Sequence, residues 1–272
     1  MLVINVLLAD YALKPVLQEP WKLDFSVMYQ PRTYRYWTEG DDLVSFVVVI
    51  KETDLYIRAK ENLYPEAVKI TQKYRLQIES YISRHPEFLT SFTPVNIEEQ
   101  APEIVKSMAE AGRVAGTGPM AAVAGAVAES VGKDLLAFSR EIIVENGGDI
   151  FLNTDRKRLV GIYAGESCLS GKLALEILPE DTPLGICTSS GTVGHSFSFG
   201  KADAVTVVSP SVSLADAAAT AIGNIVKEAD DINKAIDFAR SISGISGIMI
   251  IAGDKVGLWG KVQVSQVSSR SI

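Results

Sequence analysis

An α+β fold, with mixed sheets and helices around a central pocket, is predicted by three features of this sequence. Short β-branched runs, such as residues 142–144 and 203–208, are typical of buried strands. Longer segments with helical spacing lie between these runs. Breaks rich in glycine and hydroxyl side chains adjoin the strands and helices, and we expect them to converge on one pocket.

Composition narrows the class of protein. The chain has 272 residues, 47% of them hydrophobic, which is enough to bury a large core. A net charge of −7 argues against nucleic acid or an anionic membrane as the main partner. The first apolar stretch, residues 2–9, is too short to span a bilayer and lacks the features of a signal peptide. With only Cys168 and Cys187, no disulfide framework is expected, and we predict a cytoplasmic location.

The ends of the chain are expected to lie outside the folded domain. Residues 1–27 contain Pro15 and Pro20 and show no period, so we predict an arm, disordered or arising from a misassigned start. Residues 28–264 would form a single domain, and the Ser-rich residues 265–272 a flexible tail.

The first half of the domain combines a hairpin with helices. Residues 44–50 and 55–59 have the composition of paired strands. A four-residue apolar repeat predicts a long helix over residues 64–84, ended by His85-Pro86. Residues 101–111 predict a second helix with Pro102 in its first turn.

A third helix is predicted over residues 119–131, where small apolar residues on nearly every face indicate burial. Gly116, Thr117 and Gly118 precede it. Free N–H groups and the positive end of the helix dipole collect anions at such a start, although plain helix capping has the same appearance.

The centre of the sequence is a pair of short strands joined at Asn146-Gly147-Gly148. These residues tolerate the positive φ angles of a tight turn, and residues 150–152 then resume an apolar strand. Asp149 is thereby brought back toward the core. The glycines either make a simple hairpin or let a ligand approach the backbone, with Asp149 as its polar anchor.

A loop dense in hydroxyl groups follows a predicted strand at residues 184–188. It is either a set of turns or a loop that holds phosphates and polar rings. His195 could act there as a base, although a lone histidine is also an ordinary loop residue. The candidate binding residues are Thr188, Ser189, Ser190, Gly191 and Thr192.

A helix is predicted from Ser213 to about residue 229, with Asp216 completing a capping box. Leu214 and Ala218 fall on its core face, whereas Asp216 and Thr220 share the opposite face. Asp216 and Thr220 either serve the helix itself or offer two hard oxygen ligands to Mg²⁺. A further helix over 231–242 and a hairpin over 248–259 complete the domain.

Two motifs carry a family resemblance. Asn146-Gly147-Gly148-Asp149, followed by the Asp216–Thr220 helix, resembles the ApbE family of FAD:protein FMN transferases. The chain as a whole is similar to an uncharacterised conserved (UPF-type) sister family in the ApbE-like superfamily, found in anaerobic prokaryotes. This likeness covers about residues 28–262 and is carried by segments 52–55, 118–125, 145–150 and 188–195.

The resemblance implies an ApbE-like fold with a flavin pocket. Asp216 and Thr220 would bind Mg²⁺, and FAD or FMN would be ligand or substrate. A transferase-like or FAD-pyrophosphate-cleaving enzyme is implied, with His195 and Asp149 as catalytic candidates. The alternative is a non-catalytic flavin- or nucleotide-binding partner of another protein, in anaerobic sulfur assimilation toward homocysteine, with which the sister family is associated.

The sequence also departs from the transferase pattern. The transferases carry a lysine where Gly118-Pro119-Met120 stands here, and their His-Ile-x-Asp-Pro segment is missing, His195 being a loose counterpart. The missing lysine favours the non-catalytic alternative, and the retained Asp216 and Thr220 favour the enzyme.

Overall fold

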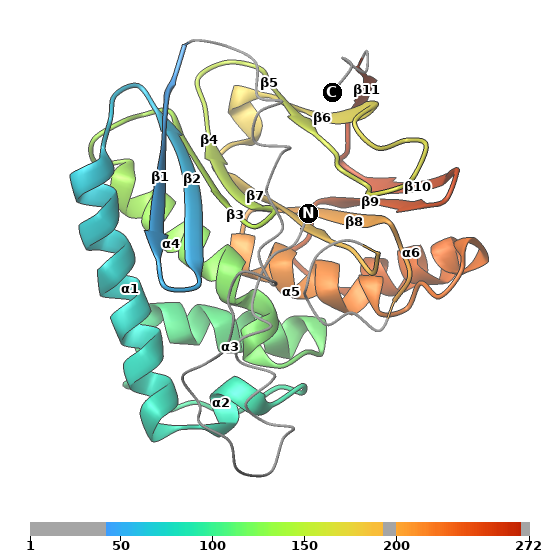
Figure 1. The fold of residues 1–272 in the computed structure, drawn as a ribbon. Helices are drawn as coiled ribbons and strands as arrows, with labels where there is room; N and C mark the ends of the chain where they lie inside the picture. The colour runs from blue at the N-terminus through green and yellow to red at the C-terminus, as the bar shows by residue number, and fades with distance from the viewer. Residues whose placement is uncertain (1–41, 193–199, 268–272) are drawn as a thin grey trace, which may run out of the picture.

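A large antiparallel sheet organises the molecule (Figure 1). The computed structural model describes residues 42–192 and 200–267. Eight strands follow the order β1-β2-β3-β4-β7-β8-β9-β10, and three more form a smaller sheet, β11-β6-β5. The strands are β1 Val44–Ile50, β2 Thr53–Ala59, β3 Ile142–Asn146, β4 Asp149–Asn153, β5 Arg158–Gly161, β6 Leu173–Ile177, β7 Leu184–Ser189, β8 Ala204–Ser209, β9 Gly247–Ala252, β10 Lys255–Gly260 and β11 Val264–Gln266.

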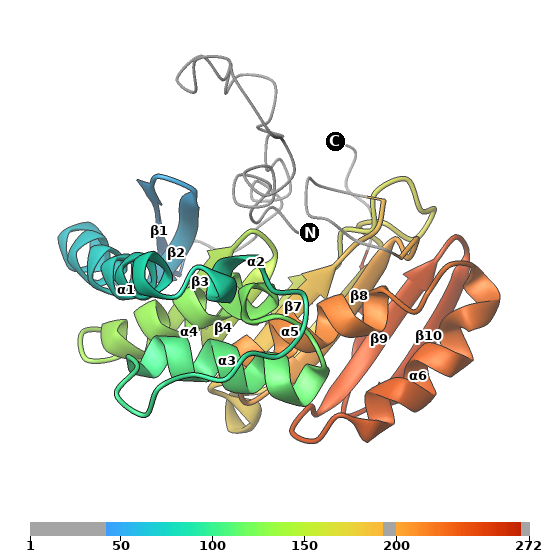
Figure 2. The same cartoon turned by 90° about the horizontal axis from the view of Figure 1, so that it is seen from below.

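The helices cover one face of the large sheet (Figure 2), and the small sheet covers part of the other (Figure 1). Each interface has its own apolar core, as expected for a layered α+β domain. The helices are α1 Tyr64–Arg84, α2 Glu87–Thr90, α3 Glu103–Ala115, α4 Val123–Leu135, α5 Val212–Gly223 and α6 Ile232–Ser241, with 3₁₀ turns η4 Pro119–Ala122, η5 Pro179–Asp181 and η6 Ala229–Asp231.

The predicted α+β class is confirmed, and the sheets differ from the prediction only in direction. Every strand pairing in the described residues is antiparallel, so the sheets are not mixed. Tight turns such as Gly147–Gly148, with φ angles of 68° and 107°, reverse the chain between neighbouring strands.

Several predicted boundaries are wrong for local reasons. Helix α3 continues through Gly112 to Ala115, where Gly116 adopts the left-handed conformation of a C-cap. Helix α5 ends at Gly223 instead of near residue 229. The expected tail also begins later, because Val264–Gln266 pair with β6 as strand β11.

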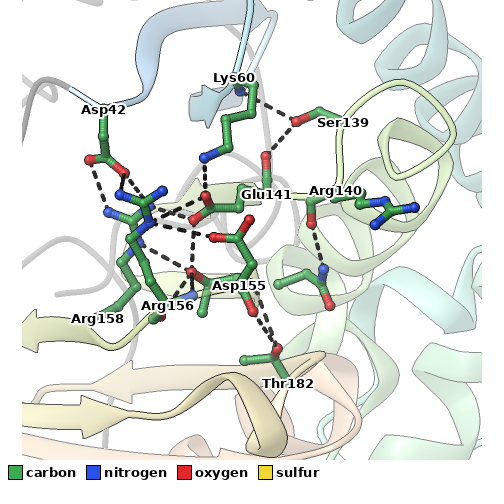
Figure 3. Close-up of polar contacts among 11 residues, drawn as sticks. Asp42, Lys60, Ser139, Arg140, Glu141, Asp155, Arg156, Arg158 and Thr182 are labelled. Atoms are coloured by element: carbon green, nitrogen blue, oxygen red, sulfur yellow. Dashed lines mark hydrogen bonds and ion pairs between the residues drawn. The ribbon is translucent and has the colours of Figure 1, made fainter.

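A polar network occupies the open end of the β3–β4 hairpin (Figure 3). Glu141, immediately before β3, is fully buried and forms ion pairs with Lys60, Arg156 and Arg158. Arg158 also donates to both carboxylate oxygens of Asp42, at 3.1 and 2.6 Å. Because Arg158 belongs to the small sheet and Lys60 follows β2 of the large sheet, this network joins the two sheets.

None of the single helices in the described chain has the length and apolarity to cross a membrane. Helix α3 and the segment from Pro119 to Leu135 pass that test only as a pair, bent by 107°.

Candidate functional site

The turn between β3 and β4 is attached to the beginning of helix α4. Asn146 is buried, and its Nδ2 donates to the carbonyl oxygen of Ala124 at 3.2 Å. The N–H of Gly148 donates to Oε1 of Glu145 at 3.0 Å. The turn therefore fixes the end of the sheet against the first turn of α4.

Asp149 and Cys187 lie side by side beneath helix α5. They are paired residues of β4 and β7, and both are fully buried. The Sγ of Cys187 lies 3.4 Å from the carbonyl oxygen of Val212, which accepts its hydrogen bond. Burial raises the pKa of the Cys187 thiol well above its usual value, and the negative charges of Asp149 and Asp216 raise it further. Cys187 is therefore a neutral core thiol and not a nucleophile.

Asp216 is buried and caps helix α4. Its side chain is 4% exposed, and its Oδ2 accepts the N–H of Gly125 at 2.9 Å. Burial raises the pKa of Asp216 well above its ordinary value, and so does the charge of Asp149, against the opposing effect of hydrogen bonds from the backbone of Gly125 and Ala124. The positive end of the α4 dipole thus faces a carboxylate of the protein itself.

This position corrects the prediction that Asp216 faces away from the core. Helix α5 packs against α3, α4, β7 and β8, and nearly all of its residues are buried. A helix enclosed on all sides has no solvent face on which an aspartate can lie. The predicted capping box is also wrong, because Ser211 is the N-cap and its Oγ accepts the N–H of Leu214 at 3.3 Å.

Glu129 of α4 caps the beginning of helix α5 in the same way. From the middle of α4, its Oε2 accepts the N–H groups of Val212 and Ser213, at 2.9 and 3.1 Å. Helices α4 and α5 therefore cap each other through Glu129 and Asp216. Sequence reasoning missed Glu129, although an acidic residue in a helix apolar on every other face was a usable signal.

Thr220 and Ser189 extend the site along α5. Thr220 is half-buried, one helical turn beyond Asp216. A Cβ added to Gly223 would lie 3.5 Å from the Oγ of Ser189, so Ser189 contacts this part of the helix. Thr188 points to the opposite face of the sheet, where its hydroxyl lies 3.0 Å from that of Thr206.

The rest of the hydroxyl loop is tied to its own neighbours. The Thr192 hydroxyl donates to Oδ1 of Asp203 at 3.0 Å, and the N–H of Gly191 donates to the carbonyl of Ala202 at 2.9 Å. The Oγ of Ser190 accepts the N–H of Thr192 at 3.2 Å. His195, the predicted base, lies outside the described residues.

The glycines before α4 allow the backbone to turn and to pack closely against neighbouring segments. Gly116 forms the left-handed cap of α3, and a Cβ added to Gly118 would lie 1.8 Å from the carbonyl oxygen of Ser91. Thr117 is buried, and its hydroxyl has no hydrogen-bond partner in the described part of the chain. No described contact joins these three residues to Asp216.

A cavity of about 390 Å³ lies between α1, the β1–β2 turn and the start of α4. Asn146, which the sequence predicted as a pocket residue, is part of its lining, and so is Met120. Sequence reasoning missed the rest of the lining: Lys51, Glu52, Thr53, Arg75, Ile78, Glu79, Ile82, Ser83, Val123, Ala124 and Val127. Asn146 connects the cavity to the Gly-Gly turn and so to Asp149 and Asp216.

The donor set around Asp216 is made of oxygen atoms. Asp149, Asp216 and Thr220 supply carboxylate and hydroxyl groups, which suit hard cations such as Mg²⁺. Over residues 42–192 and 200–267, no group of three or more His, Cys, Asp and Glu residues is arranged to enclose a metal.

Comparison with known proteins gives the chain a family. A family model described as AbpE bacteria matches residues 35–255. A UPF0280 protein of Methanocaldococcus jannaschii is 47% identical over 221 residues, covering 79% of this chain and 90% of that protein. A UPF0280 protein of Methanocella arvoryzae is 44% identical over 214 residues, covering 78% and 87%.

The fold is also found among solved structures. The flavin transferase ApbE from Vibrio cholerae matches with a TM-score of 0.54 at 13% identity, covering 80% of this chain and 96% of that one. The apo form of the Pseudomonas stutzeri flavinyl transferase ApbE gives a TM-score of 0.53, also at 13% identity, and covers 80% and 94%. Identity this low shows a common fold, and the family follows from the closer relatives. The chain belongs to the UPF0280 family, which has the ApbE-like fold.

Proposed function

We propose that this protein is a Mg²⁺-dependent flavin- or nucleotide-binding protein that acts on the pyrophosphate of FAD. The observation that carries the proposal is the buried pair of acids, Asp149 and Asp216, in an ApbE-like fold. Each charge opposes the other, so a bound cation would stabilise both. Named flavin transferases share this fold, which supports a flavin nucleotide as the ligand.

The residues present fit Mg²⁺. One carboxylate oxygen of Asp216 accepts the N–H of Gly125, and Thr220 adds a hydroxyl one helical turn away. When bound, Mg²⁺ would neutralise the charge of a pyrophosphate and stabilise the departing phosphate. Asp216 would hold the cation, and Asp149 and His195 are the candidates for proton transfer.

Two reactions are consistent with this site. Hydrolysis would add water across the pyrophosphate bond of FAD and release FMN and AMP. Transfer would move the FMN group to a hydroxyl of an acceptor protein, again with release of AMP. Of the segments predicted to bind the nucleotide, Asn146 with the Gly147–Gly148 turn and Ser189 lie on the same face of the sheet as Asp149 and would contact it.

A second function is favoured by one observation. The start of α4 has no lysine, and the N–H groups there are already satisfied by Asp216. A protein with these features can bind a flavin without cleaving it. The second candidate is therefore a non-catalytic flavin- or nucleotide-binding partner of another protein, in sulfur assimilation toward homocysteine in an anaerobe.

Thermal unfolding with Mg²⁺ and FAD tests the shared part of both functions. Wild type should be stabilised by about 2.7 kcal/mol when the nucleotide is at about 100 times its Kd. Asp216→Asn should lose this gain, whereas Asp254→Asn, at an exposed turn, should keep it. No gain in wild type with any flavin nucleotide, or an equal gain in Asp216→Asn, would refute the metal site.

Analysis of the same mixtures by chromatography separates the two candidates. Release of FMN and AMP from FAD that depends on Mg²⁺ and Asp216 identifies an enzyme. Intact FAD recovered from a stabilised complex identifies a binding partner.

A further inference from the structure

The cavity between α1 and α4 has two apolar walls that face each other. Ile78 and Ile82 lie one turn apart on α1, and Val123 and Val127 one turn apart on α4. Pairs at this spacing form a ridge along each helix, so the space between them is a slot. Its volume of about 390 Å³ lies within the range of small-molecule pockets.

The inner end of the slot is polar. Asn146 lines it and donates through Nδ2 to the carbonyl oxygen of Ala124, which fixes the orientation of the amide. The remaining amide oxygen is an acceptor for a ligand N–H. An apolar slot with one fixed polar group at its end suits a flat ring with a hydrogen-bonding edge.

The solvent end of the slot is closed by the β1–β2 turn. Lys51 occupies the first position of this two-residue turn with a φ of 53°, a conformation that favours glycine. Arg75 on α1 donates to Glu52 and Glu79, each at 2.7 Å, and to the hydroxyl of Thr53. The Nζ of Lys51 donates to Glu79 at 2.8 Å.

These ion pairs hold a strained turn across the mouth of the slot. Burial raises the pKa of Glu79, but hydrogen bonds from Lys51 and Arg75 outweigh that effect and lower it overall, so Glu79 is ionised at neutral pH. Arg75 is central, because it contacts Glu52 and Thr53 of the hairpin as well as Glu79 of the helix, and the Lys51–Glu79 pair adds a second link between the turn and α1.

We propose that this slot binds the flat ring of a flavin, and that the turn fastened by Arg75 closes over it. The inference rests on the proposed function for the identity of the ring. The inference adds a site for the ring alone, where binding needs neither Mg²⁺ nor a phosphate group on the ligand. This site is formed by other elements than helix α5, which carries Asp216.

Riboflavin, which has the ring but no phosphate, is the probe. Its fluorescence should be quenched by wild type without Mg²⁺. Val127→Phe, which fills the slot from α4, should weaken binding by at least about tenfold. Ile82→Phe fills the slot from α1. It replaces Val127→Phe in this test if circular dichroism shows that Val127→Phe does not fold. Leu76→Phe adds the same ring to an exposed position of α1 and should bind normally.

Release of riboflavin tests the closing role of the turn. Arg75→Gln should speed dissociation by about tenfold in a stopped-flow experiment, because the turn is no longer held to α1. An unchanged rate overturns that role.

The outcomes separate this inference from the proposed function. Riboflavin binding that is absent or unaffected by the filling variants, together with Mg²⁺-dependent stabilisation by FAD, overturns the slot alone. Riboflavin binding that the filling variants abolish, without any effect of Mg²⁺ and FAD, overturns the proposed function alone. Loss of both effects overturns both.

Discussion

The two ends of the β3–β4 hairpin each bury carboxylates, but in opposite electrostatic surroundings. At the open end, Glu141 is surrounded by Lys60, Arg156 and Arg158 (Figure 3). At the turn end, Asp216 faces the charge of Asp149 and the N–H groups of Ala124 and Gly125. Within the described residues, no lysine or arginine pairs with Asp216.

The pKa shifts follow this difference. Burial raises the pKa of Glu141, but hydrogen bonds from Lys60, Asp155, Arg158 and Thr154 outweigh burial and hold it well below its ordinary value of 4.5. For Asp216, burial and a like charge act together and raise the pKa. A buried acid whose charge is already compensated has a structural role, whereas one that faces another acid gains from a cation. The two ends of one hairpin therefore differ in whether the charge of the buried acid is compensated by cationic side chains.

Glu141→Gln should have the largest effect on stability. The substitution leaves the surrounding cations without their buried partner, and such losses cost about 3–5 kcal/mol. We expect a value of about 3 kcal/mol, at the low end, because Lys60 and Arg156 are partly exposed and can turn to water. Urea denaturation measures the change. Glu110→Gln, which breaks an exposed pair with Arg113, is the control and should change nothing measurable. An equal loss in both variants would show that the network is not structural.

Gly125→Ala should have an intermediate effect at the other end. Its Cβ would lie 2.5 Å from the carbonyl oxygen of Val212 and 2.8 Å from the Cβ of Asp216, so α4 and α5 would have to separate. Overpacking of this kind costs about 1–3 kcal/mol. Gly161→Ala, where an added Cβ meets nothing within 4 Å, is the control, and both are measured by urea denaturation. A Gly125→Ala protein as stable as the Gly161→Ala protein would contradict the mutual capping of these helices.

Asp216→Asn should have the smallest effect in the absence of metal. Asparagine caps a helix about as well as aspartate, so stability should change by no more than about 0.5 kcal/mol near pH 4, where Asp216 of the folded state keeps its proton. The dependence on pH should change more clearly. A raised pKa means that the folded state keeps a proton that the unfolded state releases, so stability falls as pH rises above the unfolded value of 3.8.

Asp216→Asn should therefore flatten this fall above about pH 4. Glu141→Gln should flatten the opposite slope, because the lowered pKa of Glu141 contributes stability above 4.5 that is lost as pH falls. Urea denaturation at pH values above and below about 4 measures both slopes, the slope of Asp216 above it and the slope of Glu141 below it. Parallel curves for Asp216→Asn and wild type would mean that Asp216 and Asp149 do not interact as described.

The sequence by itself determined the local elements and the family. Apolar spacing placed α1 over the residues it occupies, and Gly147–Gly148 predicted the hairpin turn that is observed. These features depend on residues close together in the chain, which is where periodicity and turn chemistry act. Segments 52–55, 118–125, 145–150 and 188–195 also indicated an uncharacterised, UPF-type sister family of the ApbE transferases, and the relatives identify it as UPF0280.

Only the tertiary structure decided what the polar residues do. Asp216 caps a helix through Gly125, 91 positions earlier in the chain, and Glu129 caps one through Val212, 83 positions later. Arg75 pairs with Glu52 of the β1–β2 turn, and both residues line one cavity. Burial and the sign of the nearest charge set the state of each carboxyl, and both depend on which distant segments pack together. Local spacing therefore predicted where Asp216 lies on its helix, but packing against α4 and β7 determined what it faces.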